Sequence, residues 1–259
     1  QSATVYLDAT GSVTITAATV DNGSTDNCSG LTLVVTPNIM SCANLGANTV
    51  ILHATDGSGN TATASATVTV VDNIDPTITA PVDVQVNVDA GTCAAATANV
   101  ALGAATTADN CAANAATNDA PASYALGTTT VTWTVTDAAG NSATDSQIVT
   151  VVDNIDPVAI TQNISVSLGT NGAVSTTAAA VNDGSTDNCA ISTYVLDVTS
   201  FDCNDLANAG ANTVTLTVTD ASGNSDTETA TVTVVDNINP TITAPAAVQV
   251  NVDAGSCTT

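Results

Sequence analysis

Short stretches of the chain alternate small apolar residues with threonine. The clearest are NTVILHATDGSGN (48–60), TTVTWTVTDAAGN (129–141) and NTVTLTVTDASGN (212–224), and each is followed by a second alternating run that ends in Val-Asp-Asn. A period of two is that of a half-buried β-strand, and glycine in the D-x-x-G-N segment suits a tight turn. The pattern predicts β-hairpins. The expected inward residues are Val50, Leu52 and Ala54 in the first hairpin and Val131, Trp133 and Val135 in the second.

Each hairpin is followed by a repeated hexapeptide that ends in proline. The copies are VDNIDP at 71–76, VDNIDP at 152–157 and VDNINP at 235–240, which begin 81 and 83 residues apart. Because proline has no N–H and cannot continue a central strand, we interpret these hexapeptides as domain junctions.

A finer comparison divides the repeats into two types, A and B, in the order A-B-A-B. Residues 77–93 recur almost unchanged at 241–257, whereas DNGSTDNC at 21–28 resembles NDGSTDNC at 182–189. We therefore predict an all-β chain of tandem sandwich domains in an elongated array, and expect the sequence to be a segment of a longer string. The predicted domains are 1–72 (type A, first strand incomplete), 73–153 (type B), 154–236 (type A) and 237–259 (opening strand of a further, truncated type B).

The charge of the chain is strongly one-sided. It has no Lys or Arg against 24 Asp and Glu, a formal net charge of −24. Nucleic-acid binding needs basic side chains to displace counterions, so we exclude it. Catalysis that needs a lysine side chain is also excluded, because the sequence contains no lysine. No apolar run approaches the roughly 18 residues of a membrane span, so we expect no direct membrane insertion.

The spacing of the seven cysteines differs between the two repeat types. They lie 14 residues apart in type A and 18 apart in type B, and they form no CxxC pair that would favour a metal site. Disulfides are the expected alternative, which indicates an oxidising, extracellular compartment. The pairings predicted from the spacing are Cys28–Cys42, Cys93–Cys111, Cys189–Cys203, and Cys257 with a partner beyond residue 259.

The second repeat resembles a known module. Its DPTITAP (75–81), DAGTC (89–93), DNC (109–111) and GTTTVTWTVTDAAGN (127–141) segments are similar to those of a hyalin repeat (HYR), an immunoglobulin-like module. The resemblance covers the whole second domain and implies tandem immunoglobulin-like β-sandwich domains. Type A lacks the early cysteine of the hyalin pattern and has Gly11 and Gly172 in that vicinity.

Type A is similar to the repeats that alternate with hyalin modules in very large surface adhesins of Bacteroidota, including gliding-motility adhesins exported by the type IX secretion system. This resemblance implies adhesion, secretion and display at the cell surface. The sequence has neither a recognisable export signal nor a sorting domain.

The acidic residues gather where successive domains should meet. In an immunoglobulin-like sandwich the last strand delivers the chain to the pole opposite its own hairpin loop, so each linker meets the loops of the next domain. Carboxylate and amide oxygens are ligands that Ca²⁺ prefers. We predict interdomain Ca²⁺ held by Asp72, Asn73, Asp75, Asp109, Asp137 and Asn141; by Asp153, Asn154, Asp156, Asp183, Asp187, Asp220 and Asn224; and, at the last junction, by Asp236 and Asn237. Asp21, Asp26, Asp56 and Asn60 form the matching set at the first-domain pole.

A simpler interpretation of the same loops stays open. Asp, Asn and Gly are common in turns because their side chains cap backbone N–H groups or permit positive φ. A single D-x-x-G-N loop is explained by turn formation alone. The calcium hypothesis depends on several acidic loops converging at one junction in a chain without basic residues.

Three functions remain open, in order of preference. The first is a repetitive adhesin stalk, the second a structural subunit of an extracellular filament or sheath, and the third a carbohydrate-binding accessory module that would use Tyr6, Tyr124, Tyr194 or Phe201. We expect no enzymatic activity, because the only histidine, His53, lies on the outward face of a predicted strand and the carboxylates recur periodically. The expected partners are neighbouring repeats of the same chain or filament, with a surface polysaccharide or protein ligand left undefined.

Overall fold

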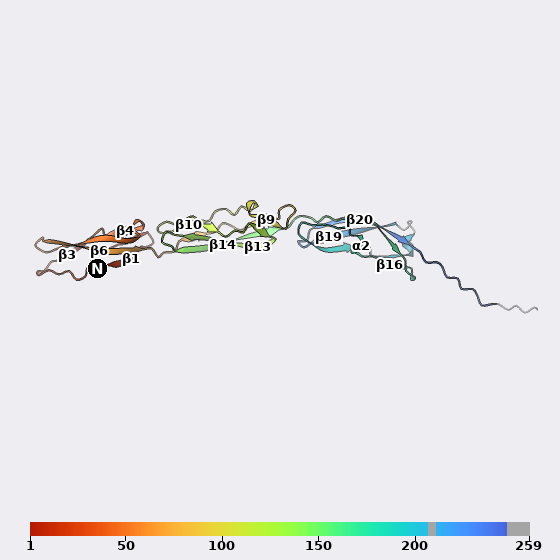
Figure 1. Cartoon of the computed structure of the whole chain (residues 1–259), viewed down its shortest axis with the longest axis horizontal. Helices are drawn as coiled ribbons and strands as arrows, with labels where there is room; N and C mark the ends of the chain where they lie inside the picture. Colours follow the sequence, from red (N-terminus) through yellow and green to blue (C-terminus); the bar gives the residue numbers. More distant parts are fainter. Residues whose placement is uncertain (207–210, 248–259) are drawn as a thin grey trace, which may run out of the picture. The chain divides into compact units, whose positions relative to one another are not determined.

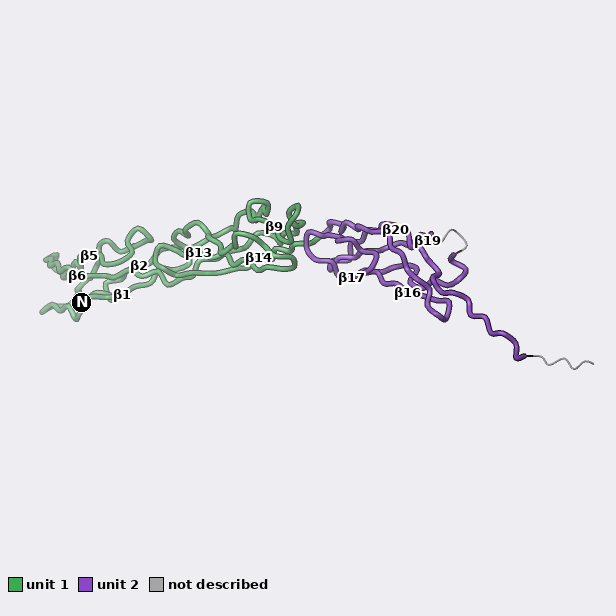
Figure 2. Tube along the Cα trace, turned by 45° about the vertical axis from the view of Figure 1, so that its right-hand side comes forward, with its two compact units in different colours: residues 1–153 green, residues 154–259 purple. Residues whose placement is uncertain are grey.

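A computed structural model describes residues 1–206 and 211–247 (Figure 1). Two compact units, residues 1–153 and 154–259, divide the chain (Figure 2). The predicted all-β class is confirmed, because within the described residues the helices are single turns. They are α1 (Ala17–Val20), α2 (Ala178–Val181), and the 3₁₀ turns η1 (Cys42–Asn44), η2 (Thr97–Asn99) and η3 (Cys203–Leu206). None of the helices in the described part is long and apolar enough to span a membrane.

The first unit contains two sandwiches. The first is built on the hairpin that the sequence predicted, and its two strands span residues 46–71. Its four-stranded sheet has the order β1-β6-β5-β3, with β1 parallel to β6, and a two-stranded β2-β4 ladder covers one face. Val50, Val68 and Val70 alternate inward and are buried against Met40 of the ladder. The strands are β1 (Ala3–Tyr6), β2 (Ser12–Thr14), β3 (Thr32–Thr36), β4 (Ile39–Ser41), β5 (Gly46–Thr55) and β6 (Thr61–Val71).

The second sandwich repeats this plan and adds one ladder. Its main sheet has the order β11-β13-β14-β8, faced by β12-β9 and β10-β7. Trp133 is buried as predicted, and its indole N–H donates to the buried Gln147 side chain over 3.1 Å. The strands are β7 (Thr77–Thr79), β8 (Val84–Asn87), β9 (Ala94–Ala96), β10 (Thr106–Ala108), β11 (Thr117–Asn118), β12 (Ser123–Ala125), β13 (Gly127–Thr136) and β14 (Ser142–Val152).

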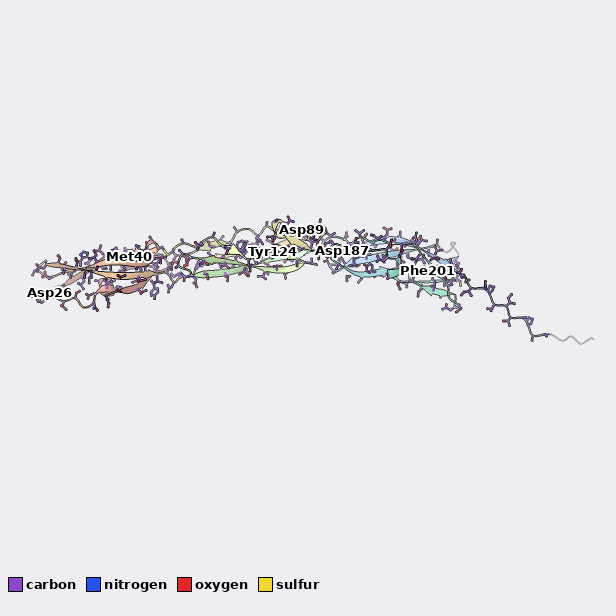
Figure 3. All side chains as sticks on the ribbon, viewed as in Figure 1. Asp26, Met40, Asp89, Tyr124, Asp187 and Phe201 are labelled. Carbon is purple, nitrogen blue, oxygen red and sulfur yellow. A yellow bond between two sulfur atoms is a disulfide. The ribbon has the colours of Figure 1, made fainter. Side chains whose placement is uncertain are left out.

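The second unit contains a third sandwich with the sheet order β15-β20-β19-β17 and a β16-β18 ladder. The large buried side chain of each facing ladder occupies the same position in all three sandwiches: Met40, Tyr124 and Phe201 (Figure 3). The strands are β15 (Ile164–Ser167), β16 (Ala173–Ser175), β17 (Ile191–Leu196), β18 (Ser200–Asp202), β19 (Ala211–Asp220) and β20 (Ser225–Val235).

Every sandwich has two poles, set by the direction of its last strand. We call the end that carries the D-N-C and D-x-x-G-N loops the entry pole; in the second sandwich these are residues 109–111 and 137–141. The opposite end, where the last strand finishes, is the exit pole. There the backbone N–H of Leu7, Val88 or Leu168 donates to the last-strand carbonyl of Val71, Val152 or Val235 over 2.9–3.0 Å.

Candidate metal centre at the first junction

Three acidic residues from different segments meet where the first sandwich joins the second. Asp72 directly follows β6, Asp109 follows β10, and Asp137 follows β13. One carboxylate oxygen of each lies within 4.8 Å of the others. The strand ends thus bring together the linker and two loops of the next domain, as the sequence predicted for this junction.

Two of the three carboxylates have an oxygen with no protein partner. Oδ2 of Asp72 and Oδ1 of Asp109 are buried and accept no hydrogen bond, and neither does the buried Oδ1 of the neighbouring Asn110. An unpaired buried polar atom typically costs 1–3 kcal/mol, and a charged one more. These oxygens therefore require a cation or water in the folded protein.

The electrostatics of the cluster favour a divalent cation. Two carboxylates within 4.8 Å repel by about 3.5 kcal/mol at an effective dielectric near 20. With no Lys or Arg anywhere in the sequence, no side-chain ammonium or guanidinium can offset this repulsion. Carboxylate and amide oxygens are hard ligands that suit Ca²⁺, so the residues present fit the predicted ion.

Asp137 is held in its ionised form by its own loop. Burial alone would raise its pKa, but the Asn141 side chain donates to Oδ2 over 2.7 Å, and the N–H groups of Gly140 and Asn141 donate to Oδ1 over 2.7 and 2.8 Å. These hydrogen bonds outweigh desolvation and lower the pKa below its ordinary value. The turn interpretation and the metal interpretation are therefore compatible at Asp137, because a capped carboxylate keeps its charge.

Other predicted ligands of this junction have different positions. Asn141 directs its side-chain N–H groups at the linker, donating to the carbonyls of Asp72 and Ile74 over 3.3 and 3.2 Å, and thereby clamps it. Asn73 and Asp75 are exposed, and Asp75 lies outside the cluster. It instead borders an adjacent pocket of about 250 Å³ that Asp109 and Asn110 also line.

Asn110 is the contact residue that sequence reasoning missed. Its side-chain amide donates to Oδ1 of Asp72 over 3.1 Å and to the carbonyl of Asp8 over 3.3 Å. The Asn110 side chain thus joins the second domain both to the linker and to the exit pole of the first domain. The available signal was the middle residue of D-N-C, which is asparagine in all three loops.

A disulfide lies beside the acidic cluster. Cys42 of the first sandwich is bonded to Cys111 of the second, with their Cα atoms 5.4 Å apart. Gly11 makes this close approach possible: its φ is +70°, and a Cβ there would lie 2.4 Å from the carbonyl oxygen of Asn110 and 2.7 Å from Sγ of Cys42. No other residue type fits this position without displacing the loop.

The predicted disulfide pairing within each repeat is wrong. Cys42 bonds to Cys111, which excludes both Cys28–Cys42 and Cys93–Cys111, and Cys203 is free, which excludes Cys189–Cys203. Cys28 is also free, whereas Cys93 and Cys189 are disulfide-bonded. Cys257 lies outside the described residues.

The reason is the length of the sandwich. In the second domain Cys93 lies at the exit pole, next to the end of β14, and Cys111 lies at the entry pole. The 11-residue β14 separates the poles by about 36 Å at roughly 3.3 Å per residue, whereas disulfide-bonded Cα atoms lie no more than about 7 Å apart. The short sequence spacing suggested that the two cysteines of a repeat bond to each other, but the fold places them at opposite poles of the sandwich.

The entry pole of the first domain has counterparts of the two loop carboxylates of the junction but not of the linker carboxylate. Asp56 accepts from the Asn60 side chain over 2.7 Å, as Asp137 does from Asn141, and this hydrogen bond lowers the pKa of Asp56. Asp26 accepts from the N–H of Cys28 over 2.8 Å and lines one pocket with Asp56. Asp21 caps its own turn through Ser24, which lowers its pKa. No third acid of the described residues completes a cluster here.

The corresponding residues of the second unit show the same local turns. Asp220 accepts from the Asn224 side chain over 2.7 Å, and Asp187 accepts from the N–H of Cys189 over 2.8 Å. Asp153 ends the first unit, and Asn154 and Asp156 begin the second. At the exit pole Asp236 accepts from the N–H of Ile238, and the Asn237 side chain donates to Ser167. Asp183, in the segment that leads into the D-N-C loop, donates its backbone N–H to the carbonyl of Ile160.

No protein-family model matches the chain, and no curated protein does. Among solved structures it is similar to the protocadherin gammaB4 extracellular domain (14% identity, TM-score 0.40), mouse cadherin-23 EC22-24 (15%, 0.39) and an E-to-A variant of titin domains I67-I69 (13%, 0.36). These matches cover 90%, 91% and 90% of this chain, and 48%, 95% and 96% of the other chains. The chain thus spans about half the length of the protocadherin.

The aromatic residues considered for carbohydrate binding divide into two groups, buried and exposed. Tyr124 and Phe201 are buried in the core, so they do not provide the exposed aromatic surface that a carbohydrate-binding module would need. Tyr6 and Tyr194 are partly exposed, on separate units. A stacking surface for a sugar ring therefore has at most one aromatic in each unit.

Proposed function

We propose that this chain is a segment of a repetitive extracellular stalk whose junctions are stiffened by Ca²⁺ and crosslinked by disulfides, and which projects from a cell surface for adhesion. The observation that carries the proposal is the cluster of Asp72, Asp109 and Asp137, with two buried, unpaired carboxylate oxygens in a chain without Lys or Arg. A cation at its centre would give these oxygens a partner and offset the repulsion between the three carboxylates.

The cation would act as a bridge between domains. Asp72 belongs to the linker, whereas Asp109 and Asp137 belong to loops of the following sandwich. A bound Ca²⁺ would supply two positive charges against the three negative charges of the carboxylates and so offset most of their mutual repulsion. Asn110 and Asn141 hold the linker against the same loops by hydrogen bonds, so the ion adds rigidity to a contact that is already specific.

The repeat extends the proposal along the chain. By sequence, Asp153, Asp187 and Asp220 are the counterparts of Asp72, Asp109 and Asp137. Asp26 and Asp56 offer the two loop carboxylates of such a site at the first entry pole, and Asp236 offers the linker carboxylate at the last exit pole. One kind of ion site would therefore recur once per domain.

Extracellular location, adhesion and the absence of catalysis are parts of the same proposal. Disulfide-bonded cysteines favour an oxidising compartment. The resemblance of the repeats to hyalin modules in large surface adhesins of Bacteroidota supports adhesion by a secreted, surface-displayed protein. Burial of Tyr124 and Phe201 makes a carbohydrate-binding module the weaker alternative.

Calcium titration of the chain tests the proposal directly. We expect isothermal titration calorimetry to detect binding, and the Asp72→Asn variant to lose at least tenfold in affinity at one site. Small-angle scattering should show a shorter average end-to-end distance after chelation, because unbalanced carboxylates loosen the linkers. An unchanged scattering profile, together with no calorimetric signal at millimolar Ca²⁺, would contradict the metal proposal.

Two substitutions serve as matched controls, because each also removes one negative charge. Glu228 is exposed on β20, far in sequence from the cluster, and Glu228→Gln should leave the affinity unchanged. Asp75→Asn changes an exposed acid of the same linker. It should have a much smaller effect than Asp72→Asn if the ion binds at the buried cluster.

A further inference from the structure

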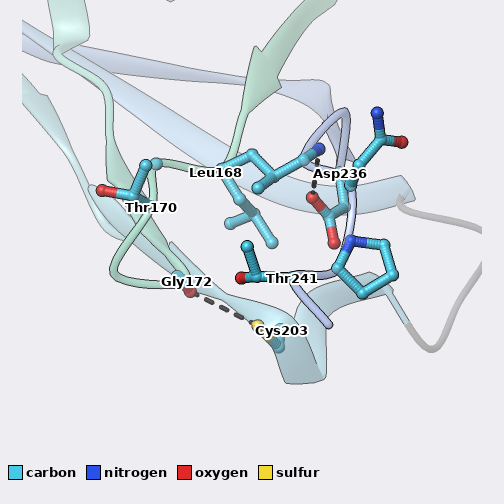
Figure 4. Close-up of a pocket in the computed structure, with 10 residues that line it drawn as sticks. Leu168, Thr170, Gly172, Cys203, Asp236 and Thr241 are labelled. Atoms are coloured by element: carbon cyan, nitrogen blue, oxygen red, sulfur yellow. Dashed lines mark hydrogen bonds between the residues drawn. The ribbon is translucent and has the colours of Figure 1, made fainter. Parts of the chain in front are cut away.

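The exit pole of the third sandwich carries an open pocket of about 390 Å³ (Figure 4). Cys203, Gly172 and Asp236 line it together with Leu168 and Thr241. Cys203 is exposed and free. A free thiol alone identifies no partner, but the first unit contains the same set of groups with their partner in place.

The two exit poles match group by group. Cys42 and Cys203 follow the equivalent strands β4 and β18, and their Sγ atoms lie 3.5 and 3.6 Å from the carbonyls of Gly11 and Gly172. Both glycines have positive φ, +70° and +73°. The thiol of the third domain is therefore presented in the geometry that, in the first domain, forms a disulfide.

The surrounding contacts correspond as well. In the first unit, the incoming loop places Asn110 against Oδ1 of Asp72 and the carbonyl of Asp8. In the second unit, the equivalent carboxylate is that of Asp236, which is exposed and lines the pocket. The counterpart of Asp8 is Gly169, which closes the same turn by accepting from the N–H of Gly172.

We propose that this pocket is a receptor for the Asp-Asn-Cys loop of a type B repeat, and that Cys203 forms an interdomain disulfide with the cysteine of that loop. The occupant is defined by the first junction, where a type A exit pole receives the D-N-C loop of a type B domain (109–111). Residues 241–257 repeat the opening of that type B domain. The inference does not depend on a bound cation.

Formation of the bond requires an oxidant, for which a small-molecule disulfide suffices. The incoming cysteine first exchanges with the oxidant to give a mixed disulfide and one small thiol. The Cys203 thiolate then attacks the cysteine sulfur of that mixed disulfide, and the second small thiolate leaves and takes up a proton. In total, two protein thiols become one disulfide and one small disulfide becomes two thiols.

The test is an extended chain in which residues 94–153 of this sequence follow Cys257, completing a fourth domain from the protein's own type B repeat. After refolding with glutathione disulfide, peptide mapping under non-reducing conditions should find Cys203 linked to the appended copy of Cys111. A bond between Cys257 and that copy, or a Cys203 that remains a free thiol, would overturn the proposal.

Two variants separate docking from chemistry. When the appended copy of Cys111 is changed to serine, no bond can form, yet docking of the loop should slow maleimide labelling of Cys203 at least tenfold relative to the 259-residue chain. Adding Gly172→Ala, which places a Cβ where the loop must enter, should restore fast labelling. Equal labelling rates with and without the fourth domain would contradict a receptor role, and Cys28 provides an internal reference for an exposed thiol.

Discussion

The exit poles of the first and third sandwiches are built from equivalent residues but differ in what covers them. At the first, Asp72 is 5% exposed, Cys42 is bonded to Cys111, and Asn110 bridges the two domains. At the third, Asp236 and Cys203 are exposed around an open pocket. The comparison shows that burial of the acidic linker is created by the loop of the following domain and is not a property of the domain that carries it.

Removing the interdomain disulfide should cause the largest difference in the free energy of unfolding between variants of the first exit pole and variants of the third. We expect the double variant Cys42→Ser, Cys111→Ser to lower the free energy of unfolding of the first unit by about 4 kcal/mol, because the bond closes a loop with a sequence separation of 69 residues. Guanidinium unfolding with separate probes for the two units measures this. Cys203→Ser, at the open pole, should change stability by less than about 0.5 kcal/mol, and an equal loss would show that the poles do not differ.

Substituting Gly11 or Gly172 should cause an intermediate loss of stability. Gly11→Ala forces positive φ on alanine and places its Cβ 2.4 Å from the Asn110 carbonyl oxygen, so we expect a loss of about 3 kcal/mol. Gly172→Ala has the same φ cost, but its only close contact is Sγ of Cys203 at 3.1 Å, so the loss should be about 1 kcal/mol. Thermal unfolding of both variants checks the ranking, and equal losses would exclude a contribution from the docked loop.

Acid titration should give the smallest effect. Burial raises the pKa of Asp137, but the hydrogen bonds from Asn141 and Gly140 outweigh it and lower the pKa overall. A carboxyl group with a lower pKa in the folded state contributes stability that is complete above its unfolded value, near 3.9, and is lost as the pH falls through the folded value. In chelator, Asp137→Asn should therefore flatten the stability profile below about pH 4.

Asp56 at the first entry pole provides the comparison for this titration. Its pKa is lowered by the same kind of asparagine hydrogen bond, but no linker carboxylate from a preceding domain packs against it within the described residues. In chelator, the like charges of Asp72 and Asp109 oppose the ionised form of Asp137, so Asp56→Asn should flatten the profile more than Asp137→Asn. A smaller effect of Asp56→Asn would mean that the junction carboxylates do not repel Asp137.

Sequence reasoning identified the strands and the acidic loops because both are local patterns. Alternation predicted burial of Val131, Trp133 and Val135, and the D-x-x-G-N motif located Asp137. The convergence of Asp72 with Asp109 followed from strand direction, a general property of the sandwich. These predictions needed no knowledge of how far apart the poles lie.

The disulfides required that knowledge. Type A places its exit-pole cysteine after the second ladder strand, at Cys42 and Cys203, whereas type B places it before the first ladder strand, at Cys93. Both repeat types therefore have a cysteine at the exit pole, but the two cysteines come from different ladder strands and so from different positions in the sequence of the repeat. Spacing along the chain therefore suggested partners within a repeat, while the fold assigns one cysteine to each end. Gly11 and Gly172 mark the positions where type A lacks the type B cysteine.

The bond between Cys42 and Cys111 also determines how the chain would respond to being pulled. Tension entering at the N-terminus passes from Cys42 through the sulfur atoms to Cys111, so the intervening backbone carries no load. The shielded segment includes β5 and β6, the longest hairpin of the first sandwich, and the linker itself. The sequence separation of 69 residues corresponds to roughly 240 Å of contour length at about 3.5 Å per residue, and stretching cannot release this length until the bond is reduced.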